Sequence, residues 1–380
     1  MNVGVICYPT YGGSGVVATE LGKSMAAKGH VIHFISYDQP ARLDFFSENL
    51  FYHEVNVSDY PLFKYPPYEI ALTSKIVEIV LSAKLDILHV HYAIPHAAAA
   101  VMAKYILKEK GINIPIITTL HGTDITLVGK DATYEPVIDY ALNQSDGVTA
   151  VSQSLKSDTN AYFHITQDIE VIPNFVDMKR FSKKPKEHFK KAIAPNSERI
   201  IVHTSNFRKV KRVDDVMRVY KKIQEKIPSK LLMVGDGPER VRLERECRES
   251  NICDQVSFLG KQDAVEEILS IADLFLMPSE TESFGLAALE AMACEVPVIS
   301  TNTGGQPEVN IDGVTGYTTN VGDIELMAEK ALYILNSDDV LRKFKDNAVA
   351  HAKTYDIHSI CPLYEQYYEK IINRVKMKMA

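Results

Sequence analysis

Short apolar runs of strand length alternate with stretches of helical period along the first half of the chain. The runs are continuous rather than alternating, which is typical of parallel strands that are buried on both faces. Strands are predicted at residues 3–7, 31–36, 51–57, 87–91, 114–120 and 147–151. Helices are predicted at 16–28, 68–83, 94–109 and 134–143. This order predicts a parallel sheet with helices on both faces.

The rhythm breaks after residue 177, where the segment 179–191 is rich in lysine, proline and polar residues, and a second series follows. Its predicted strands are 199–204, 230–234, 256–259, 274–278 and 296–300, and its predicted helices are 213–226, 240–250, 264–271 and 284–294. Residues 324–376 are mainly helical in pattern. We therefore expect an α/β chain with a first domain at 1–170, a linker at 171–196, a second domain at 197–355 and a C-terminal helix at 356–380.

Composition narrows the class of protein. Hydrophobic residues make up 46% and charged residues 24% of the 380, as in ordinary globular proteins. The net charge of −7 lacks the basic excess of a general nucleic-acid binder. The five cysteines are scattered, with no C-x-x-C pair, which favours free thiols in a reducing compartment. The N-terminus has no signal-peptide pattern and no run of 18 apolar residues occurs, so we expect a cytoplasmic protein without a membrane span.

A glycine-rich loop follows the first predicted strand. Gly13, Ser14 and Gly15 open the next helix, and residues 13–18 fit the pattern G-x-G-x-x-[G/A]. Glycine lets a backbone approach an anion closely, and a helix N-terminus directs amides at it. Three interpretations stay open: a turn that needs glycine for steric reasons alone, a loop that binds an anionic ligand, and a dinucleotide site with Asp38 as the ribose ligand.

Two glutamates, Glu282 and Glu290, flank an apolar stretch after the predicted strand 274–278. Eight residues on an ideal helix place two side chains about 80° apart and roughly 12 Å apart along the axis. If Glu282 precedes the helix, the two acids face different parts of one ligand. The amides of Phe284, Gly285 and Leu286 would then be unpaired at the helix start and could bind a phosphate.

A cluster of cations follows the predicted strand 199–204, and its members include Arg208 and Lys211. Ligands of open α/β sheets bind at the carboxyl ends of the strands. Arginine and lysine there could stabilise a diphosphate leaving group. The alternative is a solvated basic loop.

Histidines mark two more strand ends. His121 follows the strand 114–120, and either contacts a ligand or is a structural hydrogen-bonding group. His89, His91 and His96 form a second group. No carboxylate at a suitable spacing accompanies them, so we predict no metal site and no cofactor.

Taken together, these motifs resemble those of retaining glycosyltransferases of family 4, which have the GT-B fold: two Rossmann-like domains that face a central cleft. The resemblance rests on the E-x7-E pair, the cation loop after a strand, the glycine-rich first loop and the histidine at a strand end, and it covers nearly the whole chain. Residues 9–15, 120–124 and 205–208 resemble most closely the branch that transfers GlcNAc from UDP-GlcNAc to the hydroxyl of L-malate in bacillithiol biosynthesis.

The resemblance implies roles for individual residues. Catalytic roles fall on His121, Arg208, Lys211 and Glu282. Nucleotide-sugar binding falls on Gly13, Ser14, Gly15, Ser283, Phe284, Gly285, Leu286 and Glu290. Acceptor binding falls on Ser14, Tyr92 and Thr123, with Arg42 and Lys64 as further cations suggested by loop position. The UDP-sugar would be a substrate, and neither a metal nor another cofactor would be required.

Other functions remain open at this level. A family 4 enzyme could use a lipid, an inositol phosphate or a polysaccharide as acceptor. An NAD-dependent oxidoreductase would explain the glycine-rich loop and Asp38 but would leave Glu282, Glu290, Arg208 and Lys211 without a role. A non-catalytic sugar-binding protein is a third alternative. A homo-oligomer is compatible with all of them.

Overall fold

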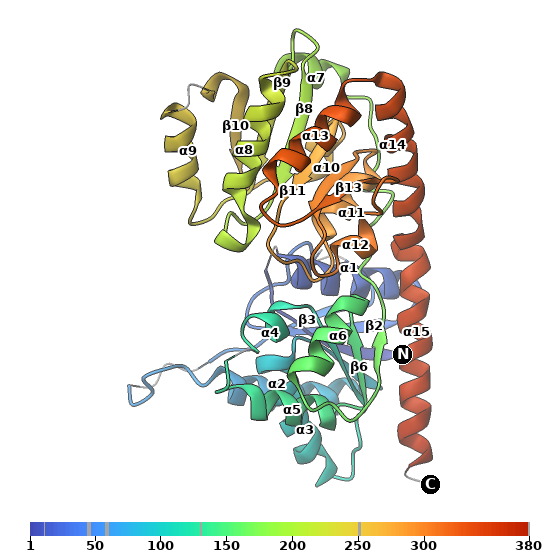
Figure 1. The fold of residues 1–380 in the computed structure, drawn as a ribbon. Coiled ribbons are helices and arrows are strands. Elements are labelled where there is room, and N and C mark those ends of the chain that lie inside the picture. The colour runs from blue at the N-terminus through green and yellow to red at the C-terminus, as the bar shows by residue number, and fades with distance from the viewer. Residues whose placement is uncertain (11, 44–46, 58–60, 130, 250–251, 379–380) are drawn as a thin grey trace. The chain divides into compact units, whose positions relative to one another are not determined.

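The computed structural model describes residues 1–10, 12–43, 47–57, 61–129, 131–249 and 252–378. The chain divides into two compact units (Figure 1). Unit 1 comprises Met1–Asn174 together with Ile357–Ala380, and unit 2 comprises Phe175–Asp356. Each unit is a parallel sheet with helices, as the pattern of apolar runs predicted.

The sheet of unit 1 has seven parallel strands in the order β3-β2-β1-β4-β5-β6-β7. The strands are β1 (Asn2–Ile6), β2 (Val31–Ser36), β3 (Leu50–Glu54), β4 (Ile87–His91), β5 (Ile116–Leu120), β6 (Gly147–Ala150) and β7 (Ile169–Val171). Six of these were predicted, and β7 was not. The central strands β4 and β5 are buried throughout, which explains their continuous apolar sequence.

Helices cover both faces of this sheet. The helices of unit 1 are α1 (Gly13–Ala27), α2 (Tyr68–Ala83), the π-helical segment η1 (Ala93–Ala97), α3 (Ala98–Lys108), α4 (Thr123–Thr126), α5 (Glu135–Gln144), α6 (Gln153–Tyr162) and α15 (Ile357–Met377). A core formed by α2, α3 and the strands lies on one face and includes Leu72, Ile76 and Val90. The helices α1 and α15 pack together.

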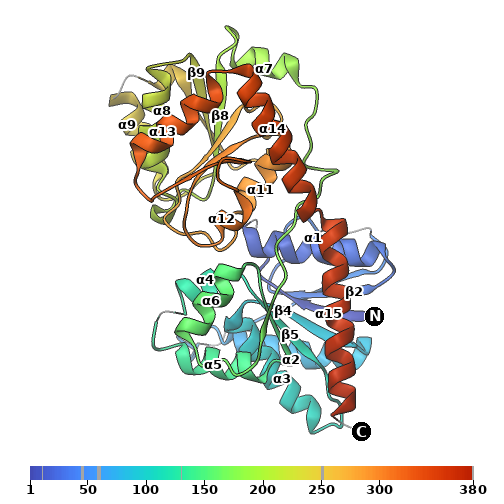
Figure 2. The same cartoon turned by 45° about the vertical axis from the view of Figure 1, so that its right-hand side comes forward.

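The C-terminal helix α15 belongs to unit 1 although it follows unit 2 in the sequence (Figure 2). The Tyr368 hydroxyl lies 2.6 Å from His89 Nδ1 of β4, and the Tyr367 hydroxyl donates to the Val148 carbonyl of β6. Glu365 pairs with Lys28 at the end of α1. The last helix therefore packs on the sheet and on α1 of unit 1.

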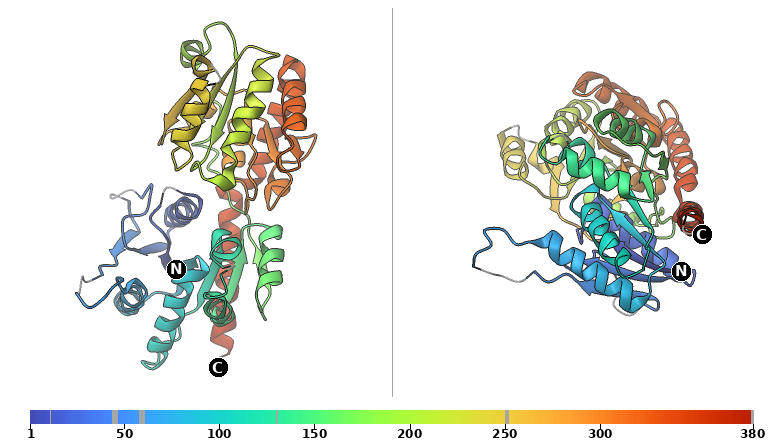
Figure 3. Two further views of the ribbon diagram at one scale, coloured as in Figure 1. Left: turned by 60° about the vertical axis from the view of Figure 1, so that its left-hand side comes forward. Right: turned by 90° about the horizontal axis from the view of Figure 1, so that it is seen from below.

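Unit 2 has six parallel strands in the order β10-β9-β8-β11-β12-β13. They are β8 (Arg199–Thr204), β9 (Ser229–Val234), β10 (Val256–Gly260), β11 (Leu274–Met277), β12 (Val298–Thr301) and β13 (Gly316–Thr319). The helices are α7 (Glu187–Ile193), the 3-10 helix η2 (Lys209–Lys211), α8 (Val213–Gln224), α9 (Arg240–Glu249), the 3-10 helix η3 (Cys253–Gln255), α10 (Val265–Leu269), α11 (Leu286–Ala293), α12 (Gln306–Val309), α13 (Ile324–Leu335), α14 (Asp338–Ala352) and the 3-10 helix η4 (Lys353–Tyr355). The helix α8 packs against α13, and α11 packs against α14 (Figure 3).

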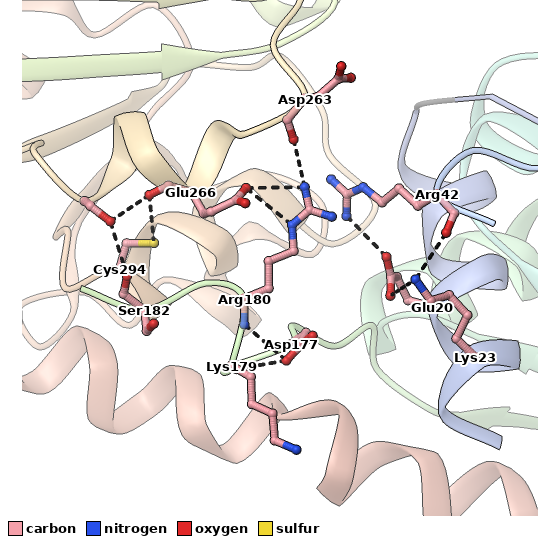
Figure 4. A network of polar contacts seen from close by, with 11 residues as sticks. Glu20, Lys23, Arg42, Asp177, Lys179, Arg180, Ser182, Asp263, Glu266 and Cys294 are labelled. Carbon is pink, nitrogen blue, oxygen red and sulfur yellow. Dashed lines mark hydrogen bonds and ion pairs between the residues drawn. The ribbon is translucent and has the colours of Figure 1, made fainter. Parts of the chain in front are cut away.

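Most of the segment 171–196, expected as a linker, is part of unit 2. Arg180 donates to the Asp263 carbonyl and pairs with Glu266 of α10 (Figure 4). Lys186 pairs with Glu267, and Lys190 pairs with the buried Asp273. Two of the lysines that made this segment look like a linker therefore attach it to acidic partners.

The strand order reverses direction once in each sheet, between β1 and β4 in unit 1 and between β8 and β11 in unit 2. Ligands of open parallel sheets bind at such switch points, beside the carboxyl ends of the strands. The loops after these four strands carry most of the residues singled out from the sequence. No helix in the described part of the chain is long and apolar enough to cross a membrane.

Candidate active site

The loops after β8 and β11 meet at the switch point of unit 2. Lys211 Nζ donates to Glu282 Oε1 at 2.6 Å, and the Ser279 hydroxyl donates to the same oxygen at 2.9 Å. The Glu280 amide also donates to the Val210 carbonyl. Two residues that lie 71 positions apart in the sequence are thus in direct contact, and they present a lysine and a glutamate at one strand edge.

The cations of the first loop differ in their partners. Arg212 donates to Asp215 at 2.5 Å, so its charge is compensated within unit 2. Arg208 is exposed and forms no ion pair with any residue that the structure describes. Lys211 is partly exposed, with 21% of its side chain accessible. Arg208 and Lys211, the two cations to which the sequence assigned a role, are therefore both accessible to an anion from solvent.

The helix that carries Glu290 begins later than expected. We predicted a helix over 284–294, whereas α11 spans Leu286–Ala293 and is preceded by Gly285 in the left-handed conformation, with φ at +97°. The first amides bonded within the helix are those of Ala288 and Leu289, which donate to the Gly285 carbonyl. The amides at the helix start are therefore those of Leu286 and Ala287 rather than that of Phe284.

The side chain of Phe284 is buried and packs edge-on against Tyr355, with ring centroids 5.7 Å apart. Its ring is thus a core group that anchors the loop, and only its backbone remains for a ligand. Ser283 and Glu290 are both partly buried, one before and one within α11. Glu282 lies in the loop four residues before the helix, whereas Glu290 lies within it.

Sequence reasoning did not identify the glycines that support these loops. A Cβ on Gly304 would lie 2.1 Å from the Glu282 carbonyl, and one on Gly305 would lie 2.3 Å from the Ser283 carbonyl. A Cβ on Gly235, after β9, would lie 1.8 Å from the Ser205 carbonyl. The close backbone contact requires glycine in each case. A glycine after a strand was the available signal, but its partner is distant in the sequence.

A buried histidine also fixes the first loop. His203 Nδ1 donates to the Leu276 carbonyl at 2.8 Å, so its Nε2 accepts from the Ser205 hydroxyl at 2.8 Å. Burial lowers the pKa of His203 to about 4. The neutral ring therefore joins the ends of β8 and β11 without adding charge.

In unit 1, two glycines of the glycine-rich loop have different structural roles. A Cβ on Gly15 would lie 2.5 Å from the Thr10 carbonyl and 2.6 Å from the Tyr8 carbonyl, so this glycine is required for steric reasons. Nothing lies within 4 Å of a Cβ on Gly13. The Gly15 amide donates to the Gly12 carbonyl, which leaves the amides of Gly13 and Ser14 at the helix start. Tyr11, part of the quoted motif, lies outside the described residues.

His121 follows β5 and is held by its neighbours. The buried Asp124 carboxylate accepts from the amides of His121 at 3.2 Å, Gly122 at 2.8 Å and Ala93 at 3.1 Å. It therefore ties the loop after β5 to the loop after β4. Burial raises the pKa of Asp124 to about 6 although these amide hydrogen bonds oppose the shift.

Two predicted acceptor residues lie beside His121. The Tyr92 ring stacks on the His121 ring, with centroids 5.7 Å apart and planes 17° apart. The hydroxyl groups of Tyr92 and Thr123 hydrogen-bond to each other. Ser14 lies in the first turn of α1. This helix follows β1, the strand that pairs with β4. The structure thus brings His121, Tyr92 and Thr123 together at the carboxyl edge of the sheet.

The proposed acceptor cations are less favourably placed. Arg42 lies 3.8 Å from Glu20, and its carbonyl accepts from Lys23 (Figure 4). Lys64 is exposed and lies over the Tyr65 ring at 5.4 Å. Neither cation contacts Tyr92, Thr123 or His121 through an interaction that the structure shows.

Family comparisons agree with the geometry. The model described as Glycosyltransferase Family 4 matches residues 11–180, and the model described as Glycosyl transferases group 1 matches residues 184–351. The N-acetyl-alpha-D-glucosaminyl L-malate synthase of Bacillus anthracis is 48% identical over 349 residues, which cover 92% of this chain and 91% of that protein.

Solved structures establish the fold. Anabaena HepE, solved in complex with UDP-glucose, has a TM-score of 0.83 at 18% identity and covers 97% of this chain and 100% of its own. Sucrose-phosphate synthase from Thermosynechococcus elongatus has a TM-score of 0.80 at 21% identity, over 98% of this chain and 99% of its own. The GT-B fold class is therefore confirmed, and the chain belongs to the family 4 glycosyltransferases.

Proposed function

We propose that the chain transfers GlcNAc from UDP-GlcNAc to the hydroxyl of L-malate, with retention of the anomeric configuration. One observation carries this proposal: the 48% identity, over 92% of the chain, to a synthase that is named for this product. The lysine, arginine and helix start at one strand edge of unit 2 support it, because they are suited to a diphosphate.

In this proposal, unit 2 binds the UDP part of the donor. Lys211 and Arg208 neutralise the diphosphate, and the amides at the start of α11 donate to its oxygens. Glu290 accepts from the ribose hydroxyls, while Glu282 and the Ser283 region face the sugar. Lys211 is held by Glu282 until the donor arrives, so its charge is already in position when the leaving group develops negative charge.

The reaction breaks the bond between C1 of GlcNAc and the diphosphate oxygen, and forms a bond from C1 to the malate hydroxyl oxygen. We propose that the malate hydroxyl proton passes to an oxygen of the departing diphosphate. No protein nucleophile is then needed, and the E-x7-E pair is not the carboxylate pair of a retaining glycosidase. No metal ion takes part in this scheme.

Unit 1 supplies the remaining groups. His121 hydrogen-bonds the transferred sugar, and the amides of Gly13 and Ser14 bind an anionic oxygen. The hydroxyl groups of Tyr92, Thr123 and Ser14 donate to malate. Arg42 and Lys64 remain as candidates for its second carboxylate.

We further propose that the enzyme acts in a reducing compartment such as the cytoplasm. All five cysteines are free, and four of them are buried, which suits a compartment where thiols stay reduced. Light scattering on the purified protein would measure its oligomeric state and test for a homo-oligomer.

Mass spectrometry tests the proposed reaction. The purified chain is incubated with UDP-GlcNAc and L-malate, and parallel reactions contain an inositol phosphate, a lipid acceptor or NAD(H) in place of malate. We expect UDP and GlcNAc-malate in equal amounts. Turnover with another acceptor but not with malate would disprove the proposed acceptor and leave the family assignment intact.

A further inference from the structure

Three histidines gather at the carboxyl edge of the sheet of unit 1, two of them fully buried and the third, His121, partly buried. His89 and His91 lie on β4, and His121 follows β5, which pairs with β4. His91 Nδ1 lies 2.8 Å from His121 Nε2, and the two rings stack with centroids 5.0 Å apart. One of these nitrogens must donate to the other, so the tautomer of one ring sets the tautomer of the next.

The surroundings of His91 favour one direction of this hydrogen bond, from His91 to His121. His91 is fully buried, and its Nε2 has no hydrogen-bond partner among the described residues. A proton on Nε2 would be a buried donor without a protein acceptor, an arrangement that folded proteins almost never contain. A lone pair at the same position is better tolerated. The His91 proton therefore belongs on Nδ1, where His121 Nε2 accepts it.

We propose that His91 is a positioning residue that holds His121 as the Nδ1–H tautomer, so that His121 meets its ligand as a hydrogen-bond donor. Nδ1 of His121 forms no hydrogen bond with the described residues and is not one of the buried unpaired nitrogens. This nitrogen is therefore the one available to a ligand. The tautomer makes the site select an oxygen lone pair rather than a hydroxyl hydrogen.

Neighbouring contacts keep the ring in this orientation. The His121 amide donates to Asp124, and Tyr92 stacks on the His121 ring from the end of β4. Burial lowers the pKa of His121 to about 3 and holds the pKa of His91 well below its usual value, so both rings stay neutral near pH 7. A neutral imidazole ring carries only one N–H. The direction of the hydrogen bond between His91 and His121 therefore decides which nitrogen of His121 can donate to a ligand.

The consequence for the reaction rests on the proposed function. A single donor at Nδ1 can bind an oxygen of the transferred sugar without a full positive charge beside the reacting carbon. His91 itself would touch no substrate. Its loss should therefore weaken the reaction through His121, and a residue that supplies the same donor should restore it.

Nitrogen-15 NMR of histidine-labelled protein without substrate tests the tautomer directly. Long-range ¹H–¹⁵N correlation distinguishes a protonated from an unprotonated ring nitrogen, and a His121→Gln variant identifies the His121 signals. We expect His121 to be protonated at Nδ1 in the unaltered chain. His91→Phe keeps an aromatic ring but removes the donor, and should lower the fraction of His121 in the Nδ1–H form, because an unconstrained neutral histidine prefers the Nε2–H form.

Two variants separate positioning from packing. His91→Asn can place its amide N–H where Nδ1 lies, and should restore the Nδ1–H form of His121. His89→Phe removes a neighbouring buried histidine, whose ring bonds to Thr119 and Tyr368 instead of His121, and should leave the His121 tautomer unchanged. Turnover of UDP-GlcNAc and L-malate should fall about 10- to 100-fold in His91→Phe and recover in His91→Asn.

Each result has a defined meaning. A His121 proton on Nε2 in the unaltered chain, or an unchanged tautomer in His91→Phe, would overturn the inference whatever the substrate. Normal turnover by His91→Phe with a shifted tautomer would also overturn it. Failure of the unaltered chain to use malate, with His121 in the expected tautomer, would instead count against the proposed function.

Discussion

The two units place different chemistry at the same point of the same topology. At the β8–β11 switch of unit 2, a partly exposed lysine pairs with a glutamate and an exposed arginine lies nearby. At the β1–β4 switch of unit 1 and the adjoining end of β5, the side chains are neutral histidines and hydroxyl groups, and the one buried carboxylate among them, Asp124, accepts from backbone amides. Charge suits a departing diphosphate, whereas neutral donors suit a sugar and an acceptor hydroxyl. Substitutions, acid and chelation can each test this division.

The largest effect is expected at Lys211. Lys211→Ala should lower kcat by roughly 10²–10³, because one fixed electrostatic donor to the leaving group is lost. Steady-state kinetics with UDP-GlcNAc and malate would measure this. Lys209→Ala, on the same short helix but exposed and without an ion pair among the described residues, is the matched control and should change kcat little. A normal rate in a folded Lys211→Ala protein would refute the assignment of Lys211 to the departing diphosphate.

Acid should destabilise unit 1 before unit 2. Burial lowers the pKa of His89 and His121 to about 3 and that of His96 to about 4, whereas His203 in unit 2 is at about 4. A histidine with a lowered pKa contributes stability that is present above pH 6.5 and lost as the pH falls. At pH 5.5, each of these histidines therefore lowers the free energy of unfolding by about 1.4 kcal/mol.

Asp124 has the opposite effect, because a carboxyl group whose pKa is raised to about 6 stabilises the folded state as the pH falls. This gain offsets about 1 kcal/mol of the loss that the histidines cause. The net loss that these three histidines and Asp124 cause between pH 7.5 and 5.5 is therefore about 3 kcal/mol. Hydrogen exchange, corrected for its intrinsic pH dependence, would follow peptides of the two units separately. Earlier loss of protection in unit 2 would contradict the prediction.

Two glycines of one loop give a smaller and purely structural test. Gly15→Ala should lower the free energy of unfolding by about 1–3 kcal/mol, because its Cβ would contact two backbone carbonyls. Gly13→Ala meets nothing within 4 Å and should be neutral or stabilising by up to about 1 kcal/mol. Urea unfolding followed by circular dichroism would measure both. Equal effects would mean that the loop does not have the described geometry.

The smallest expected effect is that of chelation. Lysine, arginine and backbone amides supply the positive charge in our scheme, so excess EDTA should leave the initial rate unchanged. The assay is the release of UDP before and after chelation. A rate that falls with EDTA and returns with Mg²⁺ would show that the charged half of the site is incomplete without a cation.

Sequence reasoning predicted the buried strands well. The ranges 31–36, 87–91 and 199–204 coincide with β2, β4 and β8, because strands covered on both faces are continuous apolar runs. It missed β7 and β13, which lie at sheet edges and include polar residues. It also missed α6, whose sequence is polar and which buries only Leu155 and Thr159.

The site was predictable only in part, for a related reason. That Lys211 and Glu282 would lie near each other follows from two loops at one strand edge. That His91 would meet His121 depends on the register of β4 against β5, where His91 pairs with Thr119. A single sequence does not give that register. The sequence therefore suggests His91 only as a metal ligand, which we rejected, and His121 only as a ligand contact or a structural hydrogen-bonding group, and it does not predict the hydrogen bond between them.

Proton NMR of the complete reaction tests the central claim most directly. The chain is mixed with UDP-GlcNAc and L-malate, with D-malate as a parallel reaction, and the anomeric proton is followed in time. We predict a new signal with the small coupling of an α-linked GlcNAc, formed in step with UDP and only with L-malate. Release of UDP without a malate adduct, or a β-linked product, would contradict the account.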